Sequence, residues 1–486
     1  MTKVDPGLHY PIDLNALPPS WRVCYVGDAI PDIQPGFASG VHNQEGKGVP
    51  HLRPMNVDRN GRLDLSVVKY VANSDGPRLH GGDVLFNNTN SPELIGKTTS
   101  IDSDADLAFS NHMTRLRPPN GVYGRFVAHQ LHFVWMSGYF KHRCVKHVNQ
   151  ASIASGTLAK SIPLILPPID EQNRIVAEIE KQFTRLEAGV AGLRRVQANL
   201  KRYRAAVLKA ACEGKLVPTE AELQKSEVRD QKTKASFETG EALLARILTE
   251  RRQKWSGKGK YKEPGESDTT DLPRLREGWT WSRLEQLGFT FGGLTKNPKR
   301  AKLPSKLPYL RVANVYANEL RLQEVEQIGV EDSELKKLLL QPNDILIVEG
   351  NGSKDQIGRL AIWDGSIETC VHQNHLIKVR PVDARMAKWI LYWLLSPVGR
   401  DFVELVASST SGLYTLSVNK VGDLPIVIPA LAEQQRIVAE VERRLSVVDE
   451  LEAVVNANLQ RAARLRQAIL QRSFSGNLFD HSETFA

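Results

Sequence analysis

The sequence predicts an α+β fold in which one domain of mixed α/β type occurs twice, each copy followed by a long helix. The segment EQNRIVAEIE, residues 171–180, returns as EQQRIVAEVE at residues 433–442, an offset of 262 (433 minus 171). Apolar residues recur at helical spacing beyond both segments, and strand-like segments in the same order precede them. Solenoid repeats have periods of roughly 20–50 residues. The longer offset therefore indicates that a whole domain and its helix have been duplicated.

The amino-acid composition is that of a folded protein, and it does not identify a binding partner. Of its 486 residues, 41% are hydrophobic and 24% charged, which is typical of a globular protein rather than a disordered one. The N-terminal residues contain no apolar core followed by a cleavage site, and the apolar runs are too short to span a bilayer. Four separated cysteines without a CxxC pair fit reduced thiols and argue against a zinc site. We therefore expect a cytoplasmic protein with no membrane partner. The net charge of +9 permits an anionic partner without identifying it.

Two long helices are predicted at residues 166–216 and 429–479. Pro167 and Pro168 stop the preceding extended segment, and Gly214 stands where a helix would end. A helix of ~40 residues is ~60 Å long, too long for one domain to cover, so each is interpreted as half of a coiled coil. The shared apolar positions are Ile175, Ile179, Phe183, Leu186, Leu193, Tyr203 and Val207, which align with Ile437, Val441, Leu445, Val448, Val455, Leu465 and Ile469.

The segments before each helix are related more loosely. HLRPMNV at residues 51–57 resembles YLRVANV at residues 309–315, and GGDVLFN resembles PNDILIV. Each copy opens with a tryptophan after a turn-forming stretch, at Trp21 and Trp279. Between the copies, a helix with Thr239 as N-cap and a flexible linker are expected. The predicted boundaries are 1–165 for the first domain, 166–216 for its helix, 217–271 for the connector, 272–428 for the second domain, 429–479 for its helix and 480–486 for the tail.

Taken in order, these motifs resemble the specificity subunit of type I restriction–modification systems. The resemblance rests on the two PP/PA-x-x-EQ-x-RIVAE segments, the LRPMNV and LRVANV strands and the tryptophan openings, and it covers nearly the whole chain. It implies two target-recognition domains separated by a pair of long antiparallel coiled-coil helices. Each domain would read one half-site of an asymmetric, bipartite target in double-stranded DNA. The helices would dock two methyltransferase subunits, and restriction/translocase subunits would cut the DNA in phage defence, in a bacterial or archaeal cytoplasm.

Motifs for catalysis are missing from the chain. GVHNQEGKG has the wrong spacing for a Walker A loop, no [ND]PP[YF] tetrapeptide occurs, and no HExxH motif is present. We therefore expect a subunit that is non-catalytic by itself and has no catalytic residues, metal or cofactor of its own. The resemblance implies that S-adenosylmethionine, ATP and Mg belong to the partner subunits.

Candidate DNA contacts come from one basic loop and several polar loops. The run LTKNPKRAKLPSK, residues 294–306, holds five cations and no acid, although such loops are often only solvated surface. NNTNS and GNGSK follow equivalent strands, and SSTSGLY is a similar polar loop; clusters of this kind are more often plain turns. The predicted DNA-binding residues are Asn87, Asn88, Thr89, Asn90, Lys97, Lys296, Asn297, Lys299, Arg300, Asn351, Ser353, Lys354, Thr410 and Ser411.

Other readings stay open. His112 and His375 follow matching asparagines, and a buried, satisfied pair is favoured over base readers. Arg194, Arg195, Lys201, Arg202 and Arg204 are interpreted first as a solvated helix face. The alternative functions are a coiled-coil scaffold that binds only proteins and a self-contained enzyme such as a nuclease. The basic, Asn-rich loops count against the scaffold, and the missing catalytic motifs count against the nuclease.

Overall fold

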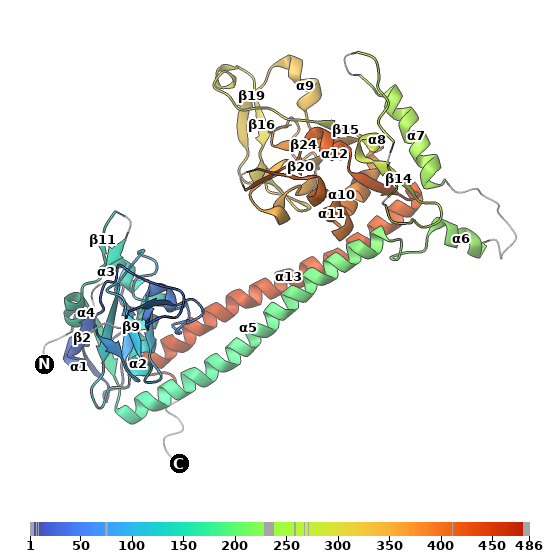
Figure 1. Cartoon of the computed structure of the whole chain (residues 1–486). Coiled ribbons are helices and arrows are strands. Elements are labelled where there is room, and N and C mark those ends of the chain that lie inside the picture. Colours follow the sequence, from blue (N-terminus) through green and yellow to red (C-terminus); the bar gives the residue numbers. More distant parts are fainter. Residues whose placement is uncertain are drawn as a thin grey trace. The chain divides into compact units, whose positions relative to one another are not determined.

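The computed structural model describes residues 4, 5, 7, 9–72, 76–148, 150–227, 238–256, 259–266, 268–270, 272–410 and 412–479. The chain divides into two compact units (Figure 1). Unit 1 comprises Met1–Arg195 with Val455–Ala486, and unit 2 comprises Val196–Val454. Each unit holds one α+β domain together with part of both long helices. Within the described residues, none of the helices combines the length and apolarity needed to cross a membrane.

Unit 1 is built around a four-stranded antiparallel sheet with strand order β2-β10-β6-β8. Its central strand β6 (Val84–Asn87) is buried throughout, because Val84 and Phe86 face helix α2 (Gly124–Met136) while Leu85 faces a second sheet. This explains why the sequence reads as a continuous apolar run rather than an alternating one. The second sheet has strand order β4-β3-β9-β5. The remaining elements are β1 (Arg22–Tyr25), α1 (Val26–Ala29), β2 (Asp32–Pro35), β3 (Val49–Leu52), β4 (Lys69–Val71), β5 (Arg78–Leu79), β7 (Thr89–Asn90), β8 (Thr98–Ser100), β9 (Leu107–Phe109), β10 (Met113–Arg117), α3 (Tyr139–Arg143), β11 (Val145–Lys146), β12 (Ala151–Ser152), α4 (Ser155–Ser161) and β13 (Pro163–Leu166).

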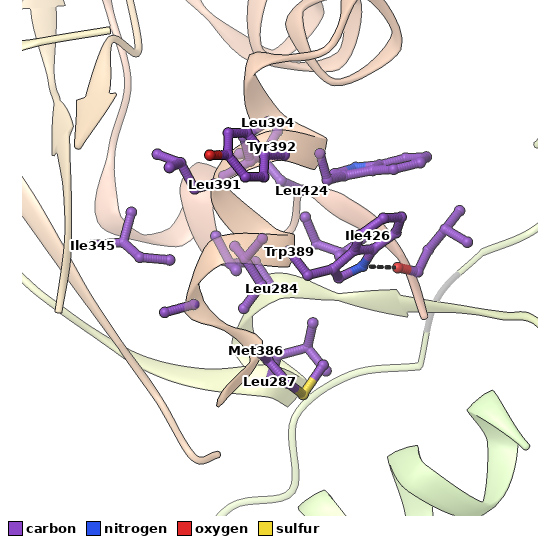
Figure 2. Close-up of a cluster of buried hydrophobic side chains, with 14 of the residues drawn as sticks. Leu284, Leu287, Ile345, Met386, Trp389, Leu391, Tyr392, Leu394, Leu424 and Ile426 are labelled. Atoms are coloured by element: carbon purple, nitrogen blue, oxygen red, sulfur yellow. Dashed lines mark hydrogen bonds between the residues drawn. The ribbon is translucent and has the colours of Figure 1, made fainter. Parts of the chain in front are cut away.

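Unit 2 repeats this plan with sheet order β15-β24-β20-β22. Strand β20 (Ile345–Val348) buries both faces, one of them against helix α10 (Ala387–Leu395). Figure 2 shows this core around Trp389, whose indole Nε1 donates to the Val427 carbonyl at 2.7 Å. The remaining elements are α6 (Glu220–Glu227), α7 (Gly240–Gln253), β14 (Thr280–Arg283), α8 (Leu284–Leu287), β15 (Gly288–Phe291), β16 (Lys306–Leu310), β17 (Val315–Tyr316), β18 (Glu319–Leu320), β19 (Glu326–Gly329), α9 (Asp332–Leu338), β21 (Gly350–Asn351), β22 (Leu360–Ile362), β23 (Val371–His372), β24 (Leu376–Pro381), α11 (Pro397–Val406), β25 (Ser408–Thr410), β26 (Leu413–Thr415), α12 (Val418–Gly422) and β27 (Pro425–Ile428).

The two long helices are α5 (Ile169–Cys212) and α13 (Leu431–Phe474), each of 44 residues. In unit 1, the first part of α5 packs on the last part of α13, with Phe183 and Phe474 in one apolar cluster. In unit 2, the last part of α5 packs on the first part of α13, with Val207 and Val441 in one cluster. The pairing is therefore antiparallel within each unit. The predicted fold class, α+β with long antiparallel helices, is confirmed.

Two positions of the predicted apolar seam are wrong. Tyr203 is 46% exposed and its counterpart Leu465 is 52% exposed. After Leu200, the seam continues four residues on, at Arg204, instead of three residues on, at Tyr203. A straight helix drifts relative to a seven-residue repeat, so the residue that faces the partner helix is decided by packing.

Thr239 is confirmed as the N-cap of α7, where its hydroxyl accepts from the Ala242 backbone N–H at 3.2 Å. Part of the predicted connector, residues 228–237, 257, 258, 267 and 271, lies outside the described residues, as does the tail, 480–486.

Candidate nucleic-acid interface

A small three-stranded sheet in unit 2 brings together two of the predicted polar segments. Its order is β21-β26-β25, so the segment that begins at Gly350 pairs with the hairpin that spans residues 408–415. Asn351 lies opposite Tyr414, and Thr410 lies opposite Leu413. The side chains of Asn351 and Thr410, and the whole of Ser411, lie outside the described residues. The backbone nevertheless places two segments about 60 residues apart in the sequence at one site (from 350–351 to 408–415).

Unit 1 contains the equivalent sheet, with order β11-β12-β7. Here the predicted residues Thr89 and Asn90 pair with Ser152 and Ala151 of the hairpin at residues 145–152. That hairpin was not among the predicted contacts. It lies at an offset of 263 (408 minus 145) from the polar hairpin of unit 2. Extending the sequence repeat to this segment would have found it.

Three of the predicted contacts in unit 1 are buried and occupied within the domain. Asn87 is fully buried and donates from Nδ2 to the Leu94 carbonyl at 2.9 Å. Asn88 donates to the Thr114 hydroxyl at 2.8 Å. Lys97 donates to the carbonyls of Pro54, at 3.1 Å, and Val57, and burial lowers the pKa of its ammonium group. Because these bonds hold turns of the domain, we leave the three residues out of the interface proposed below.

The remaining residues of NNTNS are half-buried. The Thr89 hydroxyl donates to the Asn88 side-chain oxygen at 2.7 Å, and Asn90 accepts the Ser91 backbone N–H at 2.8 Å. These bonds join neighbouring residues only, and the segment is strand β7 rather than the plain turn weighed as its alternative. Strand pairing with β12 nevertheless places both residues beside the hairpin.

Part of the basic loop of unit 2 serves the fold. Arg300 forms a bidentate pair with Glu334, at 2.8 Å to each oxygen, and its side chain is 15% exposed. This pairing lowers the pKa of the Glu334 carboxyl. Asn297 accepts the Arg300 backbone N–H at 3.2 Å. Lys296 pairs with Glu326 at 3.0 Å. Arg300 and Asn297 therefore stabilise the loop itself.

The cations left over in this loop face solvent. Lys299, Lys302 and Lys306 are exposed, and none of them forms an ion pair within the described part of the chain. In the second polar loop, Lys354 is 58% exposed and pairs with Glu404 at 3.3 Å, while Ser353 is exposed. Unpaired lysines at the surface are the groups that a phosphate backbone can engage without breaking an existing pair.

The favoured interpretation of the repeated Asn-His pair, that both copies are buried and satisfied, is wrong. His375 is 57% exposed, and its Nδ1 lies 3.2 Å from the Glu349 carboxylate. His112 is half-buried, and Asn111 is exposed. Both pairs lie in the turn just before a central strand, β10 or β24, rather than inside it. The turn lifts the side chains out of the sheet, which the alternation of the strand itself would not predict.

Comparison with known proteins gives a consistent result. No protein-family model matches the chain. The EcoKI specificity subunit of Escherichia coli (strain K12) is 24% identical over 444 residues, covering 88% of this chain and 82% of that protein. The StySPI specificity subunit of Salmonella potsdam is 22% identical over 442 residues, with the same coverage of each chain. The curated relatives are type I restriction enzyme specificity subunits. The resemblance inferred from the sequence motifs is thereby confirmed.

The likeness to type I systems extends to the fold. A solved chain from work on complex assembly and conformational transition of the type I R-M system superposes with a TM-score of 0.61 at 19% identity, covering 95% of this chain and 99% of that chain. The α+β architecture with long helices is therefore shared with a type I structure over nearly the whole length.

The two small sheets differ in the sequences of their hairpins. The hairpin of unit 1 reads VKHVNQAS and that of unit 2 reads SSTSGLYT. The sheets behind them are more alike: a buried aspartate just before the central strand pairs with a partly exposed arginine, as Asp83–Arg117 in unit 1 and as Asp344–Arg380 in unit 2, each bidentate at 2.6–2.9 Å. Similar central sheets thus carry dissimilar surface hairpins.

Proposed function

We propose that the chain is the DNA sequence-recognition subunit of a type I restriction–modification complex and is non-catalytic by itself. One observation carries the proposal: a chain that aligns over 88% of its length with a type I specificity subunit carries the same small polar sheet once in each of its two domains. Within the described residues, no group of three His, Cys, Asp or Glu side chains is placed to hold a metal ion.

Each domain would bind one half-site, and the whole target would be asymmetric and bipartite. The support is the contrast between similar cores and dissimilar hairpins, because pairs such as Arg380 with the buried Asp344 stabilise the fold whereas surface side chains read base edges. A palindromic target would call for two similar hairpins.

The long helices would dock two methyltransferase subunits, with restriction/translocase subunits joining the complex. Support comes from α13, where Val447, Leu451 and Val454 are 50%, 46% and 56% exposed. Their spacing of four and three residues places them on one side of the helix. The residues that the structure describes leave this stripe exposed, and such a stripe suits a protein partner. S-adenosylmethionine, ATP and Mg would be bound by the partners.

The alternative is a coiled-coil scaffold that binds proteins but has no DNA specificity. The exposed stripe alone would fit it equally well. The polar hairpins in both domains and the unpaired lysines of the basic loop favour DNA.

A binding selection would test the proposal. Duplexes with random sequence would be captured by the chain, with and without its methyltransferase subunits, and sequenced. We expect enrichment of two different short motifs at a fixed separation, and no methylation or cleavage by the chain alone. Replacing residues 1–165 with the corresponding domain of another specificity subunit should change one motif and leave the other unchanged. Capture without any enriched sequence would support the scaffold.

A further inference from the structure

We propose that the hairpin of strands β11 and β12 in unit 1 reads bases of the first half-site by entering the major groove of duplex DNA as a two-stranded ribbon. The residues that would face the DNA are Lys146, His147, Val148 and Gln150. This inference rests on the proposed function and names the structural element that would contact the bases in the first domain.

The hairpin has the shape that the groove accepts. It stands out from the body of unit 1 (Figure 1), and Val145, Lys146, His147, Val148 and Gln150 are all exposed. The His147 backbone N–H donates to the Gln150 carbonyl at 2.7 Å and closes the turn. The major groove, ~12 Å wide, admits a two-stranded β-ribbon.

The base of the hairpin is held firmly. Ala151 is fully buried and pairs with Asn90 of β7, and the Ile153 backbone N–H donates to the Asn88 carbonyl at 2.9 Å. At the edge, Nε2 of His147 lies 3.0 Å from the Ser152 hydroxyl oxygen. A rigid base with exposed side chains lowers the entropy lost when the hairpin binds, which favours selective contact.

Charge along the hairpin suits a polyanion. No acidic residue occurs between Lys141 and Ser152. Lys141 pairs with Glu93 at 3.3 Å. Lys146 is exposed and forms no ion pair with any residue that the structure describes. Its ammonium group is therefore available to a phosphate, a contact that adds affinity without sequence information.

The tip carries the groups that read base edges. The Gln150 amide can donate to and accept from an adenine edge, and an apolar side chain can pack on a thymine methyl group. Val148 is 99% exposed, so its apolar surface is left open by the residues that the structure describes. One exposed valine is ordinary on a protein surface. At the tip of an acid-free, protruding ribbon beside an amide, however, it matches the chemistry of A·T pairs in the major groove.

Three variants and one control test the inference. Gln150→Ala and Val148→Ser alter the tip, Lys146→Ala removes the free cation, and Val67→Ser is the matched control because Val67 is 51% exposed elsewhere in unit 1. Each variant would be assembled as full chain with methyltransferase subunits. Dissociation constants would be measured for the target selected by wild type and for every single-base substitution of it, at two or more salt concentrations.

We expect Gln150→Ala and Val148→Ser to lose discrimination of roughly 10- to 100-fold at one or two positions of a single half-site. The other half-site should be read as before. Lys146→Ala should weaken binding to all duplexes. It should also make affinity less sensitive to salt, so that the negative slope of log affinity against log salt becomes shallower by about 1. Val67→Ser should match wild type in every measurement. Circular dichroism and thermal melting would verify that each variant is folded.

Two failures are distinguishable. A wild-type complex without sequence preference would overturn the proposed function and this inference with it. A wild-type preference that both tip variants retain at every position would overturn the inference alone and leave the proposed function standing.

Discussion

The guanidinium of Arg466 in α13 lies 3.1 Å from the Glu187 carboxylate in α5, and the pair recurs in unit 2 as Arg204 and Asp449. Each partner has its counterpart 262 positions away (466 minus 204, and 449 minus 187). The surroundings differ, because the Arg466 side chain is 9% exposed and lies 3.9 Å from the centre of the Phe183 ring, whereas that of Arg204 is 30% exposed. The repeat therefore provides two related ion pairs in unequal environments.

The buried pair should contribute more to stability than its exposed counterpart. A double-mutant cycle with Arg466→Met and Glu187→Gln should give a coupling of ~1–3 kcal/mol in urea unfolding of the full chain. The matched cycle with Arg204→Met and Asp449→Asn should give at most ~1 kcal/mol. Arg62, which also pairs with Glu187, stays in place throughout. Equal couplings would show that burial does not strengthen the pair.

His132 should make unit 1 sensitive to acid. The Thr98 backbone N–H donates to its Nδ1 at 3.4 Å, and its Nε2 donates to the Arg59 carbonyl at 3.2 Å, so the ring is neutral. Burial lowers the pKa of His132 to about 4. A histidine in the unfolded chain has a pKa of ~6.5, so between about pH 6.5 and 4 the unfolded state binds more protons than the folded state. The free energy of unfolding therefore falls as the pH falls through that window.

The expected size of this effect is ~2 kcal/mol between pH 7 and 5, since each pKa unit corresponds to ~1.4 kcal/mol. His132→Gln keeps a donor and an acceptor but cannot titrate. Its free energy of unfolding should therefore fall less on acidification than that of wild type. Identical losses in the two proteins would place the acid sensitivity elsewhere, for example at His129, whose pKa burial lowers to about 3.

The unpaired lysines of the basic loop should govern salt dependence. Replacing Lys299, Lys302 and Lys306 with Gln should weaken binding to all duplexes. Because each phosphate contact releases counterions, the negative slope of log affinity against log salt should become shallower by about 2–3. The control replaces the exposed connector lysines Lys260 and Lys262, which should leave the slope unchanged. An unaltered slope in the triple variant would return the loop to ordinary solvated surface.

Glu433 should tolerate neutralisation better than truncation. Its carboxyl accepts the Trp279 indole N–H at 2.9 Å and the Glu220 backbone N–H at 3.0 Å, and burial raises its pKa. Glu433→Gln keeps an acceptor for one of the two donors, whereas Glu433→Ala leaves both donors unpaired and should cost more, ~2–3 kcal/mol of unfolding free energy. Because the raised pKa makes the folded state bind the proton more tightly, wild type should lose stability relative to Glu433→Gln as pH rises above about 4.5. Equal stability of the Ala and Gln variants would refute this role.

Much of the fold could be predicted from local patterns. The helices at residues 166–216 and 429–479 follow from apolar residues every three or four positions, with Pro and Gly at their ends, and the structure trims them only to Ile169–Cys212 and Leu431–Phe474. The duplication follows from an offset in the sequence alone. Burial of strands such as Ile345–Val348 follows from their continuous apolar runs.

The candidate site was less accessible to such patterns, because it depends on contacts between distant residues. Lys299 and Arg300 are neighbours with the same charge, yet Arg300 is held by Glu334, 34 positions away, and Lys299 is exposed. Likewise Asn87 and Asn90 belong to one polar run, but only Asn90 reaches the edge where β12 pairs.

Periodicity and repetition along the chain were thus sufficient for the long helices, the duplication and the α+β class, because these depend on residues within a few positions of one another or on direct comparison of two segments. Packing decided which residues face outward. It moved the helix seam from Tyr203 to Arg204, buried Lys97 and joined the hairpin at residues 145–152 to Thr89 and Asn90. Strand partners and burial are set by chain segments that meet only in the folded state, so no local pattern could have assigned them.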